Sequence, residues 1–146
     1  MTQSPGFQRS SEKPGGIGAE KGAVLVVDDE AVIRSLTQRM LKDGGYSTFE
    51  AADGAEALAS VLAGLPVHLV LTDIVMPQLD GVQLLDALSG SRPDLPVLLM
   101  SGHSTADLAE RGIASPCGIL MKPFNQDRLL NEVRRCIDEW TPRAAK

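Results

Sequence analysis

The sequence predicts an α/β protein with a doubly wound, five-stranded parallel sheet and five helices, and two observations lead to this fold class. Five short apolar runs alternate with longer segments in which apolar residues recur every three or four positions. The runs are largely continuous rather than alternating, which is typical of parallel strands covered by helices on both faces. With right-handed crossovers this alternation gives a doubly wound sheet. The common order for five such strands is 2-1-3-4-5, with its switch point between the first and third strands.

The first two predicted elements are a buried strand and an amphipathic helix. Residues Ala23–Val27 are wholly apolar and form the first strand. Helical spacing follows over Glu30–Asp43, and the glycine pair at 44 and 45 predicts the end of this helix. We expect its inward face to carry Ile33, Leu36 and Met40.

The second strand and helix are shorter. Ser47–Ala51 is more polar than the other strands, which predicts a place nearer the edge of the sheet. Asp53 and Glu56 have the spacing of a capping box. The helix that they begin is expected to run to Leu62 and to end near Gly64.

The same alternation continues to residue 140. Apolar runs predict strands at Leu69–Thr72, Pro96–Met100 and Gly118–Met121. Helical spacing and cap residues predict helices at Asp80–Ser89, Ser104–Arg111 and Gln126–Trp140. In the first and last of these helices, the residues expected to face inward are Leu84, Leu85, Leu88, Leu129, Val133, Cys136 and Trp140.

The 146 residues suffice for one domain with a single core. Residues 1–22 are rich in Gly, Ser and Pro and have no apolar period, so we expect a flexible tail or linker there. The folded domain is expected to span residues 23–140, and residues 141–146 form a short C-terminal tail.

Charge and hydropathy exclude several classes of partner. The net charge is -5, and because residues 1–22 carry +1, the remainder carries -6. An acidic domain without a basic stripe is a poor ligand for nucleic acid or for an anionic membrane. No apolar run has the length of a membrane span, and the N-terminus has no hydrophobic signal core, so we expect a cytoplasmic protein.

The two cysteines, Cys117 and Cys136, do not form a CxxC motif and have no histidine at ligand spacing. In a cytoplasmic protein this pattern favours reduced, partly buried thiols over a disulfide or a metal site.

Polar residues follow the apolar runs where four of the predicted strands end. These residues are Asp28 and Asp29, Asp73, Ser101 and Lys122. Ligands of doubly wound sheets bind outside the carboxyl ends of the strands. We therefore expect these five side chains to meet at one edge of the sheet.

Three carboxylates at one edge need a counter-charge. At separations near 5 Å and an effective dielectric near 20, each pair repels by roughly 3 kcal/mol. Hard carboxylate oxygens favour Mg²⁺, which completes its shell with water and phosphate oxygens. Lys122 adds a fixed positive charge, and Ser101 with Gly102 offers a hydroxyl and a backbone N–H. Asp73, alone on its strand, is the natural acceptor of a phosphoryl group.

Four motifs in this order resemble the receiver domain of two-component response regulators and hybrid sensor histidine kinases, which has a flavodoxin-like fold. The resemblance covers residues 23–140. The motifs are VLVVDDE at 24–30, LVLTDIVMPQLDG at 69–81, VLLMSGHS at 97–104 and LMKPF at 120–124.

The resemblance implies a role for each residue of the cluster. Asp73 would accept a phosphoryl group from a phosphohistidine, and Mg²⁺ would be held by Asp28, Asp29, Asp73 and the backbone carbonyl of Val75. Ser101 would supply the hydroxyl that moves toward the phosphoryl group, and Lys122 the ion-pairing amine, followed by a cis bond to Pro123.

The resemblance also implies the partners. The phosphoryl donor would be a sensor histidine kinase or a histidine phosphotransfer protein, and output would pass through a partner or a parent protein. Such a domain is modified stoichiometrically and is not an enzyme. Whether it is a stand-alone regulator or part of a hybrid kinase, and whether it forms a homodimer, stays open.

Three positions depart from the family pattern or have no assigned role. Ile119 stands where switching members carry Tyr or Phe, and because β-branched side chains are stiff we expect a muted conformational response. Val75 cannot hold an attacking water, which predicts slow self-hydrolysis of the phosphoryl group. His103 follows Ser101 by two residues and could orient water or accept a phosphoryl group, but we expect it to be an exposed loop residue.

Two other functions compete with the phosphoryl-accepting receiver. One is a receiver-like binding module that is never phosphorylated, although such modules usually lack one of the acids or the lysine. The other is a phosphohydrolase with an aspartyl-phosphate intermediate, which usually has a DxD motif and a cap over the site. Here Asp28 and Asp29 are adjacent, and the sequence has no cap insertion.

Overall fold

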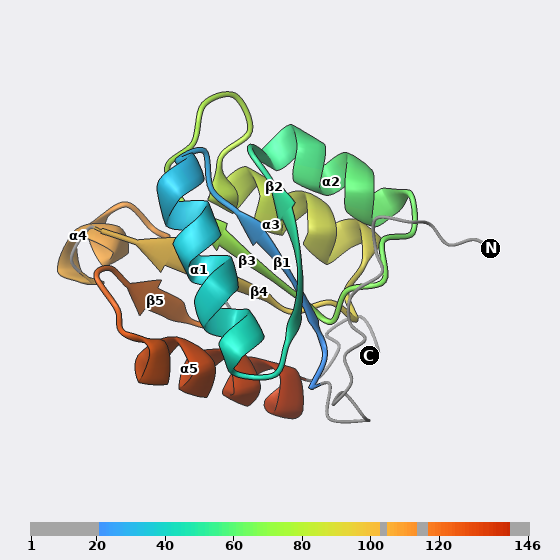
Figure 1. The fold of residues 1–146 in the computed structure, drawn as a ribbon. Helices are drawn as coiled ribbons and strands as arrows, with labels where there is room; N and C mark the ends of the chain where they lie inside the picture. The colour runs from blue at the N-terminus through green and yellow to red at the C-terminus, as the bar shows by residue number, and fades with distance from the viewer. Residues whose placement is uncertain (1–20, 103–104, 114–116, 141–146) are drawn as a thin grey trace.

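The computed structural model describes residues 21–102, 105–113 and 117–140, and it contains the doubly wound sheet that the sequence predicts (Figure 1). Five parallel strands lie in the order β2-β1-β3-β4-β5. The strands are β1 (Ala23–Val27), β2 (Ser47–Ala51), β3 (Leu69–Asp73), β4 (Val97–Ser101) and β5 (Ile119–Met121). The helices are α1 (Ala31–Asp43), α2 (Gly54–Leu62), α3 (Gly81–Ser91), α4 (Thr105–Glu110) and α5 (Gln126–Glu139).

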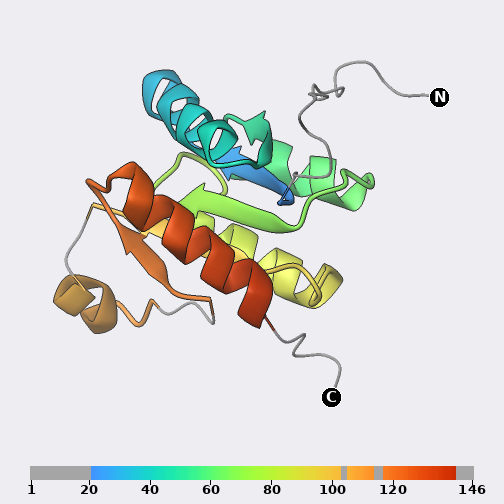
Figure 2. The ribbon, with the colours of Figure 1, turned by 60° about the horizontal axis from the view of Figure 1, so that its bottom comes forward.

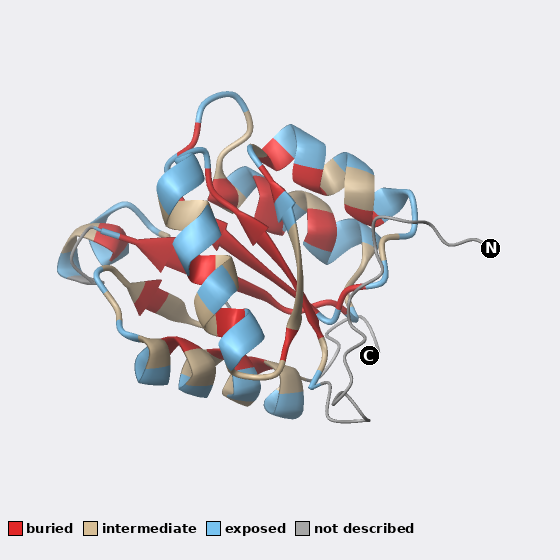
Figure 3. Ribbon diagram, viewed as in Figure 1, coloured by how far each residue is buried: buried red, intermediate tan, exposed pale blue. Residues whose placement is uncertain are grey.

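The helices cover the two faces of the sheet, with α1 and α5 on one face and α2 and α3 on the other (Figures 1 and 2). Successive strand side chains point to opposite faces, so Val24 and Val26 enter one core cluster and Leu25 and Val27 the other. The strands are therefore buried on both faces, while the outward faces of the helices are exposed (Figure 3). This explains the continuous apolar runs.

The registers of neighbouring strands bring four strand ends to the same edge. Val27 lies opposite Thr72, Asp73 opposite Met100, and Ser101 opposite Met121. The residues that follow these positions therefore leave the sheet together, beside the starts of α1 and α3. Within the described residues, no helix has the length and the apolar character needed to cross a membrane.

Side-chain caps fix the starts of three helices. Asp80 and Gln83 form a complete capping box at α3, and Asn125 caps α5. At α2 the predicted box forms only in part: Asp53 accepts from the Glu56 N–H at 2.8 Å, but the Glu56 carboxylate accepts from Ala52 rather than from Asp53. The predicted cap Ser104 of α4 lies outside the described residues.

The predicted inward face of α1 is wrong at one position. Leu36 is 49% exposed, whereas Thr37 and Leu41 are buried. Ile33 and Thr37 lie on one face of the helix, because residues four apart do so, and the Thr37 hydroxyl donates to the Ile33 carbonyl at 2.8 Å. A threonine that satisfies its own hydroxyl in this way can occupy an apolar interface.

The expectation of two free thiols is also wrong. Cys117 and Cys136 are joined by a disulfide, and no free cysteine occurs among the described residues. The two Cα atoms are 5.8 Å apart, within the range that a disulfide spans. A separation of 19 residues gives no local sign of this approach, which arises because α5 folds back along the sheet beneath β5.

Candidate functional site

Three carboxylates meet at the edge where β1 and β3 end. Asp28, Asp29 and Asp73 each offer an oxygen atom, and these atoms lie within 4.8 Å of one another. The Asp28 side chain is 0% exposed and that of Asp73 is 13% exposed, while Asp29 is exposed. The arrangement combines two carboxylates anchored in the protein with one that faces solvent.

Backbone and side-chain hydrogen bonds hold Asp28 in place. Its N–H donates to the Ala51 carbonyl at 3.2 Å, and its Oδ1 accepts from the Glu30 N–H at 2.9 Å. The Asp28 carbonyl accepts from Nη1 of Arg34 at 2.6 Å. Arg34 in turn contacts the Glu50 carboxylate at 2.8 Å, so this arginine ties the β1–α1 connection to β2.

Arg34 was not predicted to belong to this site. The residue lies on α1, six positions after Asp28, and only the return of the helix over the strand end brings the guanidinium to the backbone there. The sequence offered one sign of this contact, an acidic residue (Glu30) followed by a basic residue (Arg34) four positions later. Many exposed helices have the same charge pattern, so it did not point to the site.

Lys122 lies between the two anchored carboxylates. Its Nζ is 3.4 Å from Oδ2 of Asp28 and 3.3 Å from Oδ2 of Asp73, and its side chain is 22% exposed. The Lys122 N–H donates to the Ser101 carbonyl at 2.7 Å, which fixes the backbone beside β4. The peptide bond from Lys122 to Pro123 is cis, as the resemblance implies.

The proximity of these charges changes their protonation. Burial raises the pKa of Asp73, with a further rise from Asp28 that the nearby Lys122 opposes. Burial acts to lower the pKa of Lys122, but Asp73 and Asp28 outweigh it and the pKa is raised. The lysine is therefore charged at neutral pH, and Asp73 binds its proton more tightly than a solvated aspartate.

Ser101 ends β4 and is buried, next to the backbone of Lys122. There is free space around Gly102, since a Cβ built at this residue would meet no atom within 4 Å. His103 lies outside the described residues. Ile119 is partly buried and packs against the core cluster of the α2 and α3 face.

The segment after Asp73 turns away from the sheet toward α3. The backbone N–H of Val75 hydrogen-bonds the Asp73 carboxylate, and the Val75 side chain is 57% exposed beside it. The Gly81 N–H donates to the Ile74 carbonyl at 2.9 Å and closes the segment. A Cβ at Gly81 would collide with the Asp73 carbonyl oxygen, so only glycine permits this approach.

The donor set fits a hard divalent cation. Three carboxylates lie together with a single ammonium group, which leaves the cluster with an excess of negative charge. Carboxylate oxygens without nitrogen or sulfur donors are the ligands that Mg²⁺ and similar cations prefer. The cluster could therefore hold a metal ion.

Comparison with known proteins identifies this arrangement. The profile of the response regulator receiver domain family matches residues 24–134. The nitrogen assimilation regulatory protein NtrX of Azorhizobium caulinodans is 37% identical over 118 residues, which are 79% of this chain and 26% of NtrX. The transcriptional regulatory protein FixJ of Bradyrhizobium diazoefficiens is 33% identical over 125 residues, which are 85% of this chain and 60% of FixJ.

A solved structure supports the same assignment. The signal receiver domain of the putative response regulator NarL from Mycobacterium tuberculosis has a TM-score of 0.72 and 31% sequence identity, covering 82% of this chain and 98% of that domain. The fold and the site thus define a signalling domain of two-component systems. The chain belongs to the response regulator receiver domain family, as its motifs predicted.

The chain spans 26% of the length of NtrX and 60% of that of FixJ. The match therefore identifies a receiver domain of response regulators, a domain that takes part in phosphorelay signalling. Receiver domains of this family generally act as signalling modules and receive phosphoryl groups from sensor histidine kinases.

Proposed function

We propose that Asp73 of this chain accepts a phosphoryl group from a phosphohistidine of a sensor histidine kinase or a histidine phosphotransfer protein. The observation that carries the proposal is the position of the Lys122 ammonium, which contacts both Asp73 and the buried Asp28. An acceptor carboxylate beside a fixed cation and a divalent-metal site has what phosphoryl transfer requires, because catalysis here is mainly positioning and charge stabilisation.

In the transfer step, a carboxylate oxygen of Asp73 forms the new bond to phosphorus, and the bond between phosphorus and the donor histidine nitrogen breaks. The electron pair of that bond stays on the imidazole. Asp73 reacts as the carboxylate, and the Val75 N–H that hydrogen-bonds it orients its oxygens. The Lys122 ammonium, already 3.3 Å from the Asp73 carboxylate, then forms an ion pair with an oxygen of the phosphoryl group.

The cation in this proposal is Mg²⁺. Asp28, Asp29 and Asp73 would hold it through their carboxylates, with the backbone carbonyl of Val75 as a further ligand. The bound ion would supply positive charge to the phosphoryl oxygens. Hydrogen bonds fix the position of Asp28, so this ligand would be held rigidly. Asp29 is exposed, so the ion would reach the site from solvent on that side.

Ser101 would couple phosphorylation of Asp73 to a conformational change in the rest of the domain. Its hydroxyl, at the end of β4, would turn to donate to a phosphoryl oxygen, with the Gly102 N–H nearby. Ile119 takes the place of an aromatic ring that would move inward at the same time. We expect a smaller rearrangement around β4 and β5 than in relatives with a ring there.

The wider assignment has three parts. Residues 23–140 are assigned to the receiver domain, and the tails expected on either side fall at residues 1–20 and 141–146 outside the part of the chain that the structure describes. The domain is cytoplasmic and passes its signal through a partner or a parent protein, without binding nucleic acid itself. It accepts one phosphoryl group per chain and does not turn over a substrate as an enzyme does.

Intact mass measurement with acetyl phosphate and Mg²⁺ tests the proposal. We expect the chain to gain one phosphoryl group, with no gain in the absence of Mg²⁺ and none in Asp73→Asn. Asp86→Asn, a change at an exposed aspartate of α3, is the matched control and should gain the group normally.

A wild-type chain that gains no phosphoryl group and binds no beryllofluoride would overturn the proposal and favour a binding module that is never phosphorylated. Repeated turnover of a phosphomonoester would instead favour a phosphohydrolase. Phosphorylation of Asp73→Asn would show that the acceptor is another residue.

A further inference from the structure

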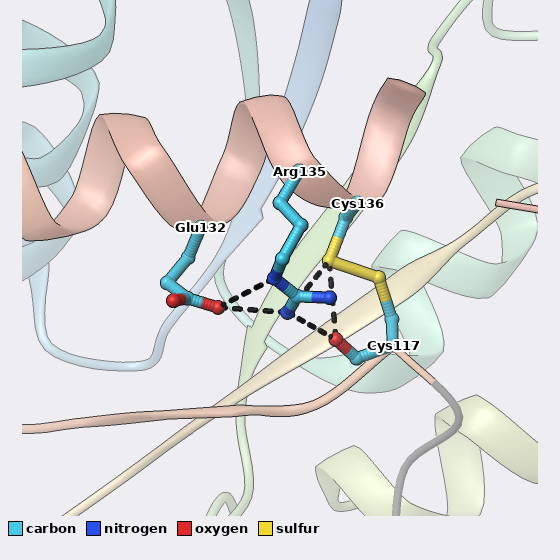
Figure 4. Close-up of a disulfide and its surroundings, with 4 residues drawn as sticks. All are labelled: Cys117, Glu132, Arg135 and Cys136. Carbon is cyan, nitrogen blue, oxygen red and sulfur yellow. Dashed lines mark hydrogen bonds and ion pairs between the residues drawn. A yellow bond between two sulfur atoms is a disulfide. The ribbon is translucent and has the colours of Figure 1, made fainter. Parts of the chain in front are cut away.

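The disulfide between Cys117 and Cys136 joins the segment that enters β5 to the last turns of α5 (Figure 4). Both cysteines are buried, and both belong to the core cluster between α5 and the sheet. Nothing in the phosphoryl-transfer chemistry uses this bond. Among the described residues, β5 is an edge strand of three residues that pairs with β4, and the disulfide adds a covalent link to α5 beside the packing of Leu120 in the same core cluster.

The surroundings of the disulfide suit the reduced state as well as the oxidised one. The Cys136 sulfur lies 3.3 Å from the carbonyl oxygen of Cys117, so a Cys136 thiol would find a hydrogen-bond acceptor already placed. On reduction the two sulfur atoms must move apart from their bonded positions, while the Cys136 thiol keeps this acceptor within reach.

A positive charge lies over the same sulfur. Nη2 of Arg135 donates to the Cys117 carbonyl at 2.7 Å and lies 3.8 Å from the sulfur of Cys136 (Figure 4). Glu132 holds the guanidinium at 2.7 Å from the preceding turn of α5. A guanidinium stabilises a thiolate that forms beside it, so Cys136 is the better leaving group of the two.

We propose that Cys117 and Cys136 form a reversible thiol–disulfide couple, through which the redox state of the surroundings sets how firmly β5 is attached to α5. The proposed cytoplasmic location agrees with this role, because cytoplasmic disulfides in mesophiles are usually transient or redox-sensing. The reductant is a dithiol, either a small molecule or a protein with a dithiol site.

The exchange step proceeds in two displacements. A thiolate of the dithiol attacks the Cys117 sulfur, forms a mixed disulfide, and releases Cys136 as a thiolate next to Arg135. The second thiol of the reductant, as its thiolate, then attacks the reductant sulfur that is bonded to Cys117. This closes the reductant's disulfide and releases Cys117 as a thiolate. Two electrons and two protons pass to the cysteines, and the reductant leaves as its disulfide.

The couple is connected to the phosphoryl site through a short path. Gly118 follows Cys117, β5 follows Gly118, and Lys122 comes directly after β5. The Leu99 N–H on β4 donates to the Gly118 carbonyl at 3.4 Å, so the entry to β5 is weakly bonded on its other side. Release of Cys117 from α5 therefore loosens the strand that carries Lys122 to Asp28 and Asp73. This consequence for phosphorylation rests on the proposed function.

The first experiment examines the couple without reference to phosphorylation. The full chain is equilibrated in dithiothreitol redox buffers, unfolded, and labelled with N-ethylmaleimide for intact mass. We expect two labels or none, with few singly labelled chains. The disulfide closes a loop of about 20 residues, so the reduced chain should melt roughly 10 °C lower. Amide hydrogen exchange in residues 117–123 and 129–140 should be faster in the reduced chain than in the oxidised one.

Arg135→Met tests the direction of attack, and Arg134→Met on the exposed face of α5 is the matched control. We expect the first change to slow reduction by dithiothreitol roughly threefold to tenfold at equal pH, and the second to leave the rate unchanged. Two free thiols in the air-oxidised chain, or equal hydrogen exchange in both redox states, would overturn the proposal.

Acetyl phosphate with Mg²⁺ supplies the second readout. We expect the rate of phosphoryl uptake to differ at least about twofold between oxidised and reduced wild type, and to be insensitive to dithiothreitol in Cys117→Ala with Cys136→Ala. If that double variant does not fold, reduced and oxidised wild type still give the comparison. No uptake in either redox state, with a redox-dependent hydrogen exchange, would reject the proposed function and retain the couple. Equal uptake and equal exchange would reject the couple alone.

Discussion

The ammonium group of Lys122 lies 3.3 Å from the Asp73 carboxylate and holds the end of β5 against the end of β3, although 49 residues separate the two in sequence. The same nitrogen is 3.4 Å from Asp28. One cation thus partly neutralises two carboxylates. Its own pKa is raised by them, so on the alkaline side these ion pairs persist through neutral pH and are lost as the pH rises through that raised value.

Replacing Lys122 by Met should separate metal binding from phosphoryl uptake. Loss of the cation leaves more negative charge on the three carboxylates, so we expect Mg²⁺ to bind about tenfold more tightly. The charge that stabilises the transferring phosphoryl group is also lost, and uptake from acetyl phosphate should fall about 100-fold. Calorimetric titration and intact mass measure the two effects.

The control is Lys42→Met, at an exposed position in the last turn of α1. We expect it to change neither quantity. Weaker Mg²⁺ binding in Lys122→Met would contradict the position assigned to the ammonium.

Arg34→Met should weaken Mg²⁺ binding without removing a ligand. The guanidinium holds the Asp28 carbonyl at 2.6 Å and contacts Glu50, so its loss frees the β1–α1 connection. Residues that orient metal ligands typically contribute about 10-fold or more to affinity. We expect a loss of that size by calorimetry, and none in Arg39→Met, which changes an exposed arginine on the same helix. Equal affinities would mean that Asp28 is oriented without Arg34.

Val75→Asn should shorten the lifetime of the phosphorylated domain. The Val75 side chain is 57% exposed beside Asp73 and has no polar atom to orient an attacking water. An amide at this position supplies one, and we expect loss of the phosphoryl group to become about tenfold faster. The decay is followed by intact mass after removal of acetyl phosphate. Val75→Leu keeps the apolar character and should keep the lifetime; the same lifetime in both variants would refute the shielding role.

Asp73→Asn should stabilise the metal-free chain at neutral pH. Burial raises the pKa of Asp73 above its value in the unfolded chain, so the folded state binds the proton more tightly. Stability therefore falls as the pH rises from the unfolded to the folded pKa, and the penalty remains above both. We expect Asp73→Asn to melt about 3 °C higher than wild type at neutral pH. The two should converge at acid pH, where Asp73 is protonated.

Mg²⁺ should raise the melting temperature of the wild type and affect Asp73→Asn less, since one ligand is lost. An asparagine variant that melts lower at neutral pH would contradict the cost of burying the Asp73 charge.

Gly81→Ala should displace the end of β3, which carries Asp73. A methyl group at Gly81 collides with the Asp73 carbonyl oxygen and forces the strand end and α3 apart. Overpacking of this kind costs about 1–3 kcal/mol, measured by urea denaturation, and we expect slower phosphoryl uptake as Asp73 shifts. Gly90→Ala, in the same helix with nothing within 4 Å of the new methyl group, should instead stabilise by about 0.5–1 kcal/mol. Destabilisation by both would indicate a general intolerance of α3.

Most of the fold could be predicted because its signals are local. Buried parallel strands need continuous apolar residues, and helices need a repeat near 3.6, so both are visible in short windows. All ten predicted elements occur within a few residues of the predicted bounds. The inward face of α1 was wrong at Leu36 because a threonine with an internally bonded hydroxyl replaces a leucine in the interface.

The acidic cluster was predictable from the sequence for a topological reason. Parallel strands all end at one edge, so a polar residue after each apolar run must lie there. Asp28, Asp73 and Lys122 meet as this argument requires. How close they come, and which charges are buried, depended on the strand registers.

The sequence by itself determined the strands, the helices, the family and the residues at the sheet edge, because each depends on local periodicity or on the order of strand ends. Only the tertiary structure decided the pairing of Cys117 with Cys136, the contact of Arg34 with the Asp28 carbonyl, and the collision that requires glycine at position 81. These contacts depend on how helices lie on the sheet, to within about an ångström, and close packing fixes that distance only when the whole core is assembled.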